Sequence, residues 1–338
     1  MQHIRPLRAD DIPALVALRR RAFSHSQRPD DEMGTYFQRV FLENPWRDDS
    51  LPSLVYVNGD ERPVGFLGVV PRPASFQGHS IRIAVSTQFM VDPDHRGVAG
   101  LHLMKEFLAG RQDLSLADLA NDSSQRLWEK LGGRTARIPS LQWTLDFMRV
   151  PRLVRGPVRL VLRVLWPRWR APRGVRRGPL TPKLMTQQLP QLLSGVSLRP
   201  EYDTRSTQWI FDQLVAKRGL GEFRSAALWD DAGVEVLGWY VYYADAEGVG
   251  RVVHFVARQG SRDLVLQELF ARGWREGLAA ITGRLETGLL RHAGKVGLTC
   301  RREGPWMLVQ SSRPEILEAV DRGDVFLSSL EGEGLLSF

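Results

Sequence analysis

The spacing of hydrophobic residues in the first half of the chain predicts a series of strands and helices. Runs rich in Val, Ile and aromatic residues alternate with segments in which apolar positions recur every three or four residues. The pair Asn58-Gly59, which lies between two apolar runs, is a strong signal for a hairpin turn. In order along the chain, we expect strands over 4–7, 54–57, 64–70, 80–91, 114–120 and 141–147, and helices over about 10–23, 30–46, 99–109 and 123–131.

The second half of the chain repeats this order of elements. The hairpin partners also look alike, since Val64-Gly65-Phe66 has a counterpart in Leu237-Gly238-Trp239. A repeated β-α-β-β-β-α-β-α-β order predicts an α/β fold with mixed sheets, built as two tandem domains of one kind. The expected strands cover 196–200, 222–229, 236–243, 251–258, 280–286, 306–310 and 324–327, and the expected helices cover 207–217, 264–277, 289–296 and 314–322.

A basic segment separates the two halves. Between Asp146 and Glu201 the chain has twelve Arg and Lys residues and no acidic residue, although the whole chain has 46 basic and 38 acidic residues. Several Pro and Gly residues interrupt the same stretch. We therefore expect an N-terminal domain over 1–149, a linker over 150–195 and a C-terminal domain over 196–338.

Within the linker, residues 157–166 have the pattern of a short amphipathic helix. Arg155, Arg159 and Arg163 share one face, opposite a row of Val and Leu side chains. Three roles stay open for the basic stretch 152–177: a solvated arm between the domains, a helix on an anionic membrane surface, or a docking site for an acidic carrier partner or nucleic acid. Because no aromatic residues alternate with the basic ones as in single-strand binding surfaces, we expect no specific nucleic-acid partner.

The composition of the 338 residues narrows the class of protein. Hydrophobic residues make up 43% and charged residues 25%, which is typical of a globular protein. No apolar run reaches the roughly 18 residues that a membrane-spanning helix needs, and the N-terminus lacks the apolar core of a signal peptide. The single cysteine, Cys300, excludes an internal disulfide framework and a multi-cysteine zinc site, and we expect it to be a small buried residue. These features predict a cytoplasmic protein without a metal, peripheral at the inner membrane face if the basic stretch binds lipid.

A candidate anion site follows the long strand that ends at Val91. Asp92-Pro93 breaks the strand, and a turn of small residues leads directly into an apolar helix. Backbone N–H groups at such a turn point toward one spot at the positive end of the helix dipole, which suits phosphate oxygens. Arg96 adds a positive charge there, and Gly97 lets the backbone approach a ligand closely.

This turn resembles a motif of the GCN5-related N-acetyltransferase (GNAT) superfamily, whose strand–loop–helix unit binds the pyrophosphate of acetyl-CoA. Three segments carry the resemblance: Ile4–Leu7 with Asp10–Ile12, Arg96-Gly97, and Asn121 with Leu127–Gly133. Together they cover residues 3–148, and the order of elements alone extends the resemblance to 196–338. The resemblance implies two tandem GNAT-like domains, of which the second is degenerate.

The resemblance also implies that the N-terminal domain binds acetyl-CoA as a co-substrate. The N–H groups of Met90 and Val91 would contact the thioester and pantetheine, and Asn121 would orient pantetheine or the acceptor. The implied CoA-binding residues are Phe89, Met90, Val91, Arg96, Gly97, Val98, Ala99, Gly100, Asn121 and Trp128.

Three residues depart from the family pattern. Ala99 and Leu101 stand where the family usually has further glycines, and Leu101 would displace one amide of the turn. Trp128 stands where many members have a tyrosine that protonates the CoA thiolate, and an indole N–H is a donor without useful acidity.

In the second half, Gln259-Gly260-Ser261 replaces the phosphate-binding loop, so we expect no CoA there and Ser261 as an N-cap. That half would instead shape the acceptor cleft. The residues expected to line the cleft are Trp239, Tyr240, Tyr242, Tyr243 and Phe255.

The resemblance implies direct transfer of the acyl group in a ternary complex, without a covalent enzyme intermediate. Gln88 could hold a water for this step. The candidate catalytic groups are Gln88, Asn121, Asp122 and the terminal carboxylate of Phe338, with Glu331 and Glu333 as further carboxylates. The apolar tail 335–338 is expected to fold back into the first domain.

We therefore expect an acyl-CoA-dependent N-acetyltransferase that acts on an amine of a small molecule or a polymer precursor. Two alternatives stay open. One is an acyltransferase for longer chains, or for membrane-associated lipid or glycan precursors. The other is a GNAT-fold binding module without catalysis, which Leu101 and Trp128 favour.

Overall fold

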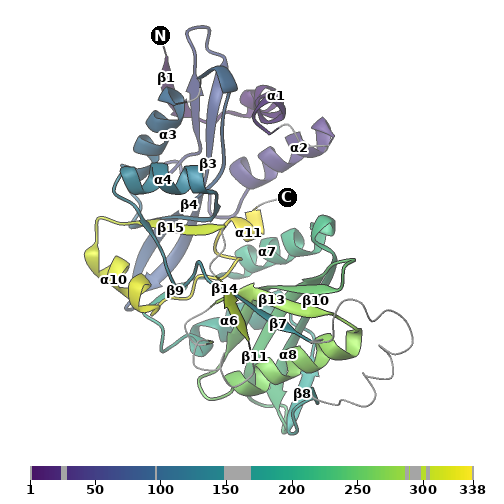
Figure 1. Cartoon of the computed structure of the whole chain (residues 1–338). Coiled ribbons are helices and arrows are strands. Elements are labelled where there is room, and N and C mark those ends of the chain that lie inside the picture. The colour runs from purple at the N-terminus through teal and green to yellow at the C-terminus, as the bar shows by residue number, and fades with distance from the viewer. Residues whose placement is uncertain are drawn as a thin grey trace.

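The computed structural model describes residues 2–23, 29–95, 97–147, 169–285, 289, 298–301 and 305–336. These residues form two sheets, which lie one above the other in Figure 1. The first sheet has the order β1 (His3–Pro6), β2 (Leu54–Val57), β3 (Pro63–Phe76), β4 (His79–Val91), β5 (Leu114–Ala120), β15 (Trp306–Gln310), β6 (Arg134–Thr135), and β9 (Leu198–Pro200) also pairs with β3. The second sheet has the order β14 (Thr299–Arg301), β7 (Gln142–Asp146), β13 (Ala280–Arg284), β12 (Val249–Ala257), β11 (Val236–Ala244), β10 (Glu222–Asp230), β8 (Val175–Gly178).

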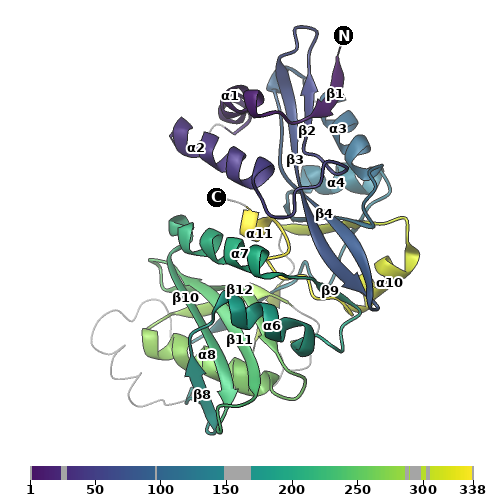
Figure 2. The same ribbon diagram turned by 180° about the vertical axis from the view of Figure 1, so that it is seen from behind.

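Helices cover both faces of each sheet, as the views from the two sides in Figures 1 and 2 show. On the first sheet, α1 (Ile12–Ala22) and α2 (Asp30–Phe37), which continues as a π-helical turn over Gln38–Leu42, lie on one face, and α3 (Val98–Leu108) and α4 (Asp122–Lys130) lie on the other. On the second sheet, α6 (Pro182–Leu192) and α7 (Thr204–Ala216) lie on one face and α8 (Arg262–Glu276) on the other. Short 3-10 turns cover Ala9–Asp11, Pro93–His95 and Arg218–Leu220, and α10 (Pro314–Arg322) and α11 (Glu333–Leu336) belong to the C-terminal segment.

Both sheets are built around the same unit. In the first sheet, β3 and β4 are antiparallel, and α3 connects β4 to the parallel strand β5. In the second sheet, β11 and β12 are antiparallel, and α8 connects β12 to the parallel strand β13. The predicted mixed α/β fold with a repeated arrangement is therefore confirmed.

Each sheet is completed by a strand from the other half of the chain. β7 lies beside β13 in the second sheet, where Leu145 is opposite Ile281. β15 lies between β5 and β6 in the first sheet, where Leu308 is opposite Ala117. Hydrophobic alternation predicts that a segment is a strand but not which strand it pairs with. The two halves of the chain therefore do not correspond to the two sheets.

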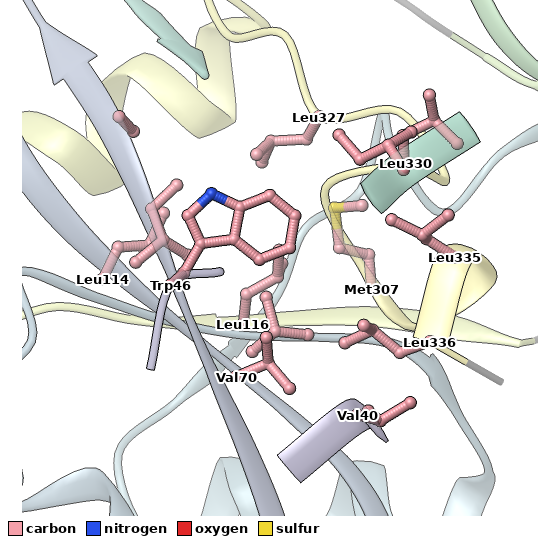
Figure 3. Packing of buried hydrophobic residues seen from close by; sticks show 14 of the residues in the cluster. Val40, Trp46, Val70, Leu114, Leu116, Met307, Leu327, Leu330, Leu335 and Leu336 are labelled. Carbon is pink, nitrogen blue, oxygen red and sulfur yellow. The ribbon is translucent and has the colours of Figure 1, made fainter. Parts of the chain in front are cut away.

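One hydrophobic core fills the space between the two sheets. It combines side chains from α1 and α2, from α6 and α7, and from the C-terminal segment. Figure 3 shows Leu335 and Leu336 in the same cluster as Val70 and Leu116 of the first sheet, with Leu336 on the side of Val70 and Leu116. The Tyr36 hydroxyl on α2 donates a hydrogen bond to the Leu336 carbonyl oxygen at 2.7 Å. The expected return of the tail into the first sheet is confirmed up to Leu336, while Phe338 lies outside the described residues.

The hairpin at Asn58 forms, but its turn is wider than the sequence predicted. It spans residues 58–62, and the residue with positive φ is Glu61, at 58°, rather than Gly59. The Asn58 side chain explains this turn, because its Oδ1 accepts hydrogen bonds from the N–H groups of Asp60 and Arg62 at 3.1 and 3.0 Å.

Other local expectations also differ from the structure. Part of the predicted linker is folded, because β8 pairs with β10 and α6 packs against α7. The predicted helix over 157–166 lies outside the described residues. In the predicted strand 324–327, the described pairing is one isolated bridge, between Leu198 and Val325. Cys300 is exposed on β14 rather than buried.

In the described part of the chain, none of the helices combines the length and the hydrophobicity needed to cross a membrane.

Candidate active site

A cleft opens in the first sheet where β4 and β5 separate. The two strands pair only over Ile83–Val85 and Leu114–Leu116, although β4 continues to Val91 and β5 to Ala120. The cleft has a volume of about 210 Å³. Its lining residues come from both faces of the sheet: Arg19, Phe23, Ser86, Thr87, Gln88, Phe89, Met104, Ala117, Leu119, Ala120, Asn121, Ser124, Trp128, Leu308 and Glu333.

A bulge in β4 shapes the wall of this cleft. Gln88 and Phe89 lie opposite the single residue Leu67, and Gln88 has a φ of 50°. A bulge of this kind bends the strand and redirects its side chains. The Gln88 side chain accepts a hydrogen bond from Arg19 Nε on α1 at 3.1 Å. Gln88 therefore lies in the lining of the cleft, and its side-chain carbonyl oxygen accepts a hydrogen bond from Arg19.

The turn after β4 is fixed by the buried carboxylate of Asp92. Arg21 Nε donates to Asp92 Oδ2 at 2.9 Å, and the Asp94 N–H donates to Asp92 Oδ1 at 3.2 Å. Burial alone would raise the pKa of Asp92, but these hydrogen bonds and the charge of Arg21 lower it overall. The negative charge of Asp92 therefore helps to hold the end of β4 against α1.

Gly97 begins helix α3 in a conformation that favours glycine. Its φ is 99°, and a Cβ atom at this position would meet no atom within 4 Å. The requirement is therefore one of backbone conformation rather than space. Gly97 has no side chain that could cap the first amides of α3, so they are available to an anion. Arg96, which the sequence predicts beside them, lies outside the described residues.

The next residues place the start of α3 against the end of β4. At Gly100, an added Cβ would approach the ring of Phe89 to 3.3 Å and Val91 Cγ2 to 3.6 Å. Ala99 is buried, and Val98 is 58% exposed. The Leu101 N–H already donates to the Gly97 carbonyl oxygen at 3.0 Å as a helical bond. Leu101 therefore removes no amide from the turn, and the glycine-poor sequence still leaves the amides of residues 98–100 at the helix start.

Of the two strand amides predicted to contact the thioester, that of Val91 points away from β3 and that of Met90 points toward it. The Asp92 N–H donates to the Val64 carbonyl oxygen of β3 at 2.8 Å, and Met90 is the Cα partner of Phe66. Because N–H directions alternate along an antiparallel strand, the Met90 N–H also points to β3 and the Val91 N–H points to the opposite side. Met90 itself is buried in the core.

The carboxylate within the cleft is Glu333 of α11. The Leu119 N–H donates to Glu333 Oε2 at 3.0 Å. Burial and the neighbouring charge of Asp118 raise the pKa of Glu333 to about 7. A carboxyl group with this pKa exchanges protons readily near neutral pH. In the sequence, Glu333 is recognisable only as a carboxylate next to an apolar tail. Nothing in the local pattern indicates that this segment contacts β5.

Asn121 and Asp122, predicted as catalytic, and Trp128, predicted to contact CoA, make hydrogen bonds within the fold, while Phe338 lies outside the described residues. Asn121 caps α4, since its Oδ1 accepts from the Ser124 N–H at 2.9 Å, although it also lines the cleft. Asp122 Oδ1 accepts from Trp306 Nε1 at 2.7 Å, which directs it to β15. Trp128 is buried, and its Nε1 donates to the Val309 carbonyl oxygen at 3.2 Å. The indole N–H is therefore committed to the sheet.

Glu331 is buried and anchors the C-terminal segment. Its carboxylate accepts hydrogen bonds from the Ser328 N–H at 2.7 Å and from the Tyr202 hydroxyl. Burial raises the pKa of Glu331. Nearby, Arg72 stacks on the Trp46 ring at 3.7 Å and donates to the Leu330 carbonyl oxygen at 2.9 Å. These contacts hold the chain that leads to Glu333.

The aromatic residues of the second half do not line a cleft. Each is at most 1% exposed, which corrects the expectation that they shape the acceptor site, and they form the core around β11 and β12; they are Trp239, Tyr240, Tyr242, Tyr243 and Phe255. Aromatic residues at consecutive positions, such as Trp239 and Tyr240, point to opposite faces and fit a strand that is buried on both. Ser261 is the N-cap of α8 as predicted, but its side chain makes no capping hydrogen bond.

Comparisons with known proteins bear on the sequence of the N-terminal region and on the fold. The sequence profile described as an acetyltransferase (GNAT) domain matches residues 3–113. No curated protein matches the chain in sequence. The sequence similarity to an acetyltransferase (GNAT) domain thus covers the N-terminal third of the chain.

Solved structures share the fold over nearly the whole chain. A probable N-acyltransferase from Enterococcus faecalis has a TM-score of 0.63 and 15% identity, with 92% of this chain and 72% of that chain covered. A GCN5-related N-acetyltransferase from Anabaena variabilis also has a TM-score of 0.63 and 15% identity, with 93% and 74% covered. A GCN5-related N-acetyltransferase from Kribbella flavida has a TM-score of 0.58 and 16% identity, with 96% and 73% covered. The likeness shows that both sheets, and not only the N-terminal region, belong to a known architecture.

Proposed function

We propose that the protein transfers an acetyl group from acetyl-CoA to the amine of a small molecule or polymer precursor. One arrangement carries the proposal: a helix start without a side-chain cap follows the end of β4, and the cleft between β4 and β5 has a carboxylate, Glu333, in its lining. The first feature suits a phosphate-bearing donor, and the second suits a proton acceptor.

The residues around the start of α3 fit the phosphate groups of CoA. The amides of residues 98–100 are the positive end of the helix dipole, and Arg96 would add a fixed charge. The Val91 N–H would donate to the thioester carbonyl oxygen, where negative charge develops during transfer. The cleft itself would hold the acyl group and the end of pantetheine, between Phe89 and Ala120.

The acceptor would approach from the face that carries α1, α2 and α11. An amine is mostly protonated in neutral solution and must lose a proton before it attacks. Glu333, with its pKa raised to about 7, would take this proton. The neutral amine nitrogen then forms a bond to the carbonyl carbon, the C–S bond breaks, and CoA leaves as a thiolate. The proton that the nitrogen loses on becoming an amide passes through water to this thiolate. Because the Trp128 N–H is held by Val309, we assign protonation of the thiolate to water.

Release of free thiol from acetyl-CoA tests the proposal directly. The purified protein is incubated with acetyl-CoA and sets of aliphatic, aromatic and amino-sugar amines, and the thiol is measured with a colorimetric reagent. Glu333→Gln is expected to bind acetyl-CoA and to release little thiol. If the wild-type protein binds acetyl-CoA without amine-dependent release with any set, the binding-module alternative replaces this proposal.

A non-catalytic binding module is the second candidate function. The hydrogen bond from the Trp128 indole to Val309 favours it, because position 128 has no tyrosine hydroxyl that could protonate the thiolate.

Longer acyl donors are tested in the same assay by replacing acetyl-CoA with octanoyl-CoA and palmitoyl-CoA. A higher kcat/KM with either would support the longer-chain alternative.

The role of the basic stretch 152–177 stays a prediction, because its described part is limited to residues 169–177. Sedimentation with anionic liposomes tests membrane association and the peripheral location that it implies. A deletion should remove only 152–168, since β8 pairs with β10 through Asp230 and its neighbours. Binding that is lost with this deletion, and in high salt, would support the membrane role. If the protein does not sediment with the liposomes, the membrane role is excluded, and the solvated arm and the acidic carrier partner remain as alternatives.

A further inference from the structure

An ion pair connects the second sheet to β5 of the first, the strand that borders the cleft. Arg284, the last residue of β13, donates from Nη1 to Asp118 Oδ2 at 2.9 Å and from Nη2 to the Asp118 carbonyl oxygen at 2.8 Å. The Asp118 side chain is completely buried, and that of Arg284 is 12% exposed. Both terminal nitrogens of the Arg284 guanidinium thus donate hydrogen bonds to the same residue of β5, Asp118.

The same aspartate holds the backbone of Glu333. The Glu333 N–H donates to Asp118 Oδ1. The chain passes so close to this carboxylate that a Cβ added at Gly332 would lie 2.2–2.4 Å from its atoms. The neighbouring amide, that of Leu119, donates to the Glu333 carboxylate at 3.0 Å. Two consecutive residues of β5 therefore fix both the backbone and the carboxylate of Glu333.

Among the described residues, few other charged groups lie near Glu333. Arg19 of α1 lines the same cleft, Tyr36 of α2 is close enough to interact electrostatically with Glu333, and β4 contributes the uncharged side chains of Thr87 and Gln88. Arg72 of β3 interacts with Asp118 from within the core. On α7, which packs against α11, the charged residues Arg205 and Asp212 are exposed. Asp118 is thus the nearby negative charge, and Arg284 is its ion-pair partner.

We propose that Arg284 is a positioning residue for Glu333: by holding the carboxylate of Asp118 and balancing its charge, it fixes the place and the proton affinity of the base. The inference rests on the proposed function, because it deepens the role of Glu333 there. It also gives the second sheet a part in the chemistry of the first, although the second half lacks the phosphate-binding turn.

The direction of the effect follows from the hydrogen bonds. Without the guanidinium charge, Asp118 repels a negative charge on Glu333 more strongly. Both Asp118 oxygens accept hydrogen bonds, from the Glu333 N–H and from residue 284, whereas Glu333 faces the cleft. The additional proton therefore goes to Glu333. Removing the charge of Arg284 raises the pH at which Glu333 loses its proton.

The test is a carbon-13 NMR titration of the Glu333 carboxyl group in the full chain. The resonance is assigned by its absence from Glu333→Gln. In Arg284→Gln, which retains a donor for Asp118, the titration midpoint is expected to rise by about one pH unit. In Arg284→Lys, which keeps the charge, it is expected to remain close to wild type. In the double variant Asp118→Asn with Arg284→Gln, where an amide pair replaces the ion pair, the midpoint should fall below that of wild type.

The matched control is Arg5→Gln. Arg5 makes a two-bond pair with Asp11, at 2.7 Å for each bond, with side chains 12% and 8% exposed, remote from the cleft. The Arg5→Gln substitution should lower the melting temperature and leave the titration midpoint of Glu333 unchanged. If Arg284→Gln also lowers the melting temperature without moving the midpoint, Arg284 is merely structural and the proposal is overturned. The same holds if Arg284→Gln fails to fold and the double variant keeps the wild-type midpoint.

Kinetics separate this proposal from the proposed function. The acid limb of the kcat/KM profile should shift with the NMR midpoint in each variant. If the midpoint shifts while Glu333→Gln keeps wild-type turnover, the relay from Arg284 stands and Glu333 is not the base. If the midpoint is unchanged in Arg284→Gln while Glu333→Gln is inactive, Glu333 remains the base and the role of Arg284 in positioning it is rejected.

Discussion

The carboxylate of Glu333 accepts a hydrogen bond from the backbone N–H of Leu119, a residue 214 positions earlier in the chain. This contact brings the C-terminal segment to the point where β4 and β5 separate. Glu333 lines the cleft together with residues of α1, β4 and β5. The candidate base, Glu333, is therefore more than 200 residues along the chain from the turn that we propose binds the donor.

Replacing Glu333 tests the base directly. Glu333→Gln keeps the size of the side chain and an oxygen for the Leu119 N–H, but it cannot accept a proton. We expect kcat to fall by about 10²- to 10³-fold with little change in acetyl-CoA binding. Steady-state thiol release gives the rate, and Glu318→Gln, on the exposed face of α10, is the control. A loss of less than fivefold would contradict the assignment.

Binding of acetyl-CoA is expected to depend on Gly97. A donor at 100 times its dissociation constant stabilises the state that binds it by about 2.7 kcal/mol. Gly97→Val forces a branched side chain into a φ of 99° and should weaken the turn by about 1–3 kcal/mol. Thermal unfolding with and without acetyl-CoA should show a shift for wild type and almost none for Gly97→Val.

The second half provides a control for that substitution. Gly260 in the loop before α8 also has a positive φ, 91°, and a Cβ added there would meet no atom within 4 Å. Gly260→Val carries a similar strain away from the cleft, so its acetyl-CoA shift should equal that of wild type. Equal shifts in both variants would show that the donor does not bind at the start of α3. Arg96→Glu tests the charge at the same place and should also abolish the shift.

The pH dependence of stability provides a third prediction. Burial and the charge of Asp118 raise the pKa of Glu333 to about 7 in the folded protein. Between the unfolded value near 4.3 and pH 7, the folded state binds more protons than the unfolded state. Stability therefore falls as pH rises through this window. Relative to wild type, Glu333→Gln should gain about 1–2 kcal/mol at pH 8, allowing for partial exposure, and nothing below pH 4. Urea unfolding at both pH values measures the difference.

His254 should act in the opposite direction at acid pH. It is buried, its Nδ1 is 2.8 Å from Ser328 Oγ, and burial lowers its pKa to about 3. In the unfolded state His254 binds a proton near pH 6.5, whereas in the folded state it stays neutral at this pH. Stability is therefore lost as pH falls below that value. We expect a loss of about 1.4 kcal/mol per pH unit from this group. His254→Asn should flatten the slope between pH 6 and 4.5, and an unchanged slope would assign it to other groups.

The exchange of β7 and β15 predicts that the halves depend on each other. A fragment ending at residue 149 would lack β15, so β5 would present an unpaired edge, and β7 would lack its partner β13. Such a fragment should aggregate when produced alone, because open edges pair with other chains. Co-production with residues 150–338 should restore a soluble complex, which size-exclusion chromatography detects. A stable, monomeric fragment 1–149 would contradict this dependence.

The sequence by itself determined the features that depend on neighbouring residues. The alternation of apolar positions predicted most strands and helices, because periodicity reports which face of an element is buried. Asn58 predicted a hairpin, and Gly97 predicted a turn into a helix, because side-chain hydrogen bonds and positive φ are local properties. The repeated order of elements also predicted two units of one fold.

Only the tertiary structure decided which distant segments meet. β7 and β15 read as ordinary strands, and no local signal says that each joins the other half's sheet. The aromatic strand around Trp239 fits a cleft wall as well as a core until its neighbours are known. Glu333 and Arg284 are far from Asp118 in the sequence but contact it in space, and Asp118 by itself looks like one carboxylate in an apolar strand. Their positions follow from the packing of the C-terminal segment between two sheets, which depends on long-range contacts that a local pattern does not encode.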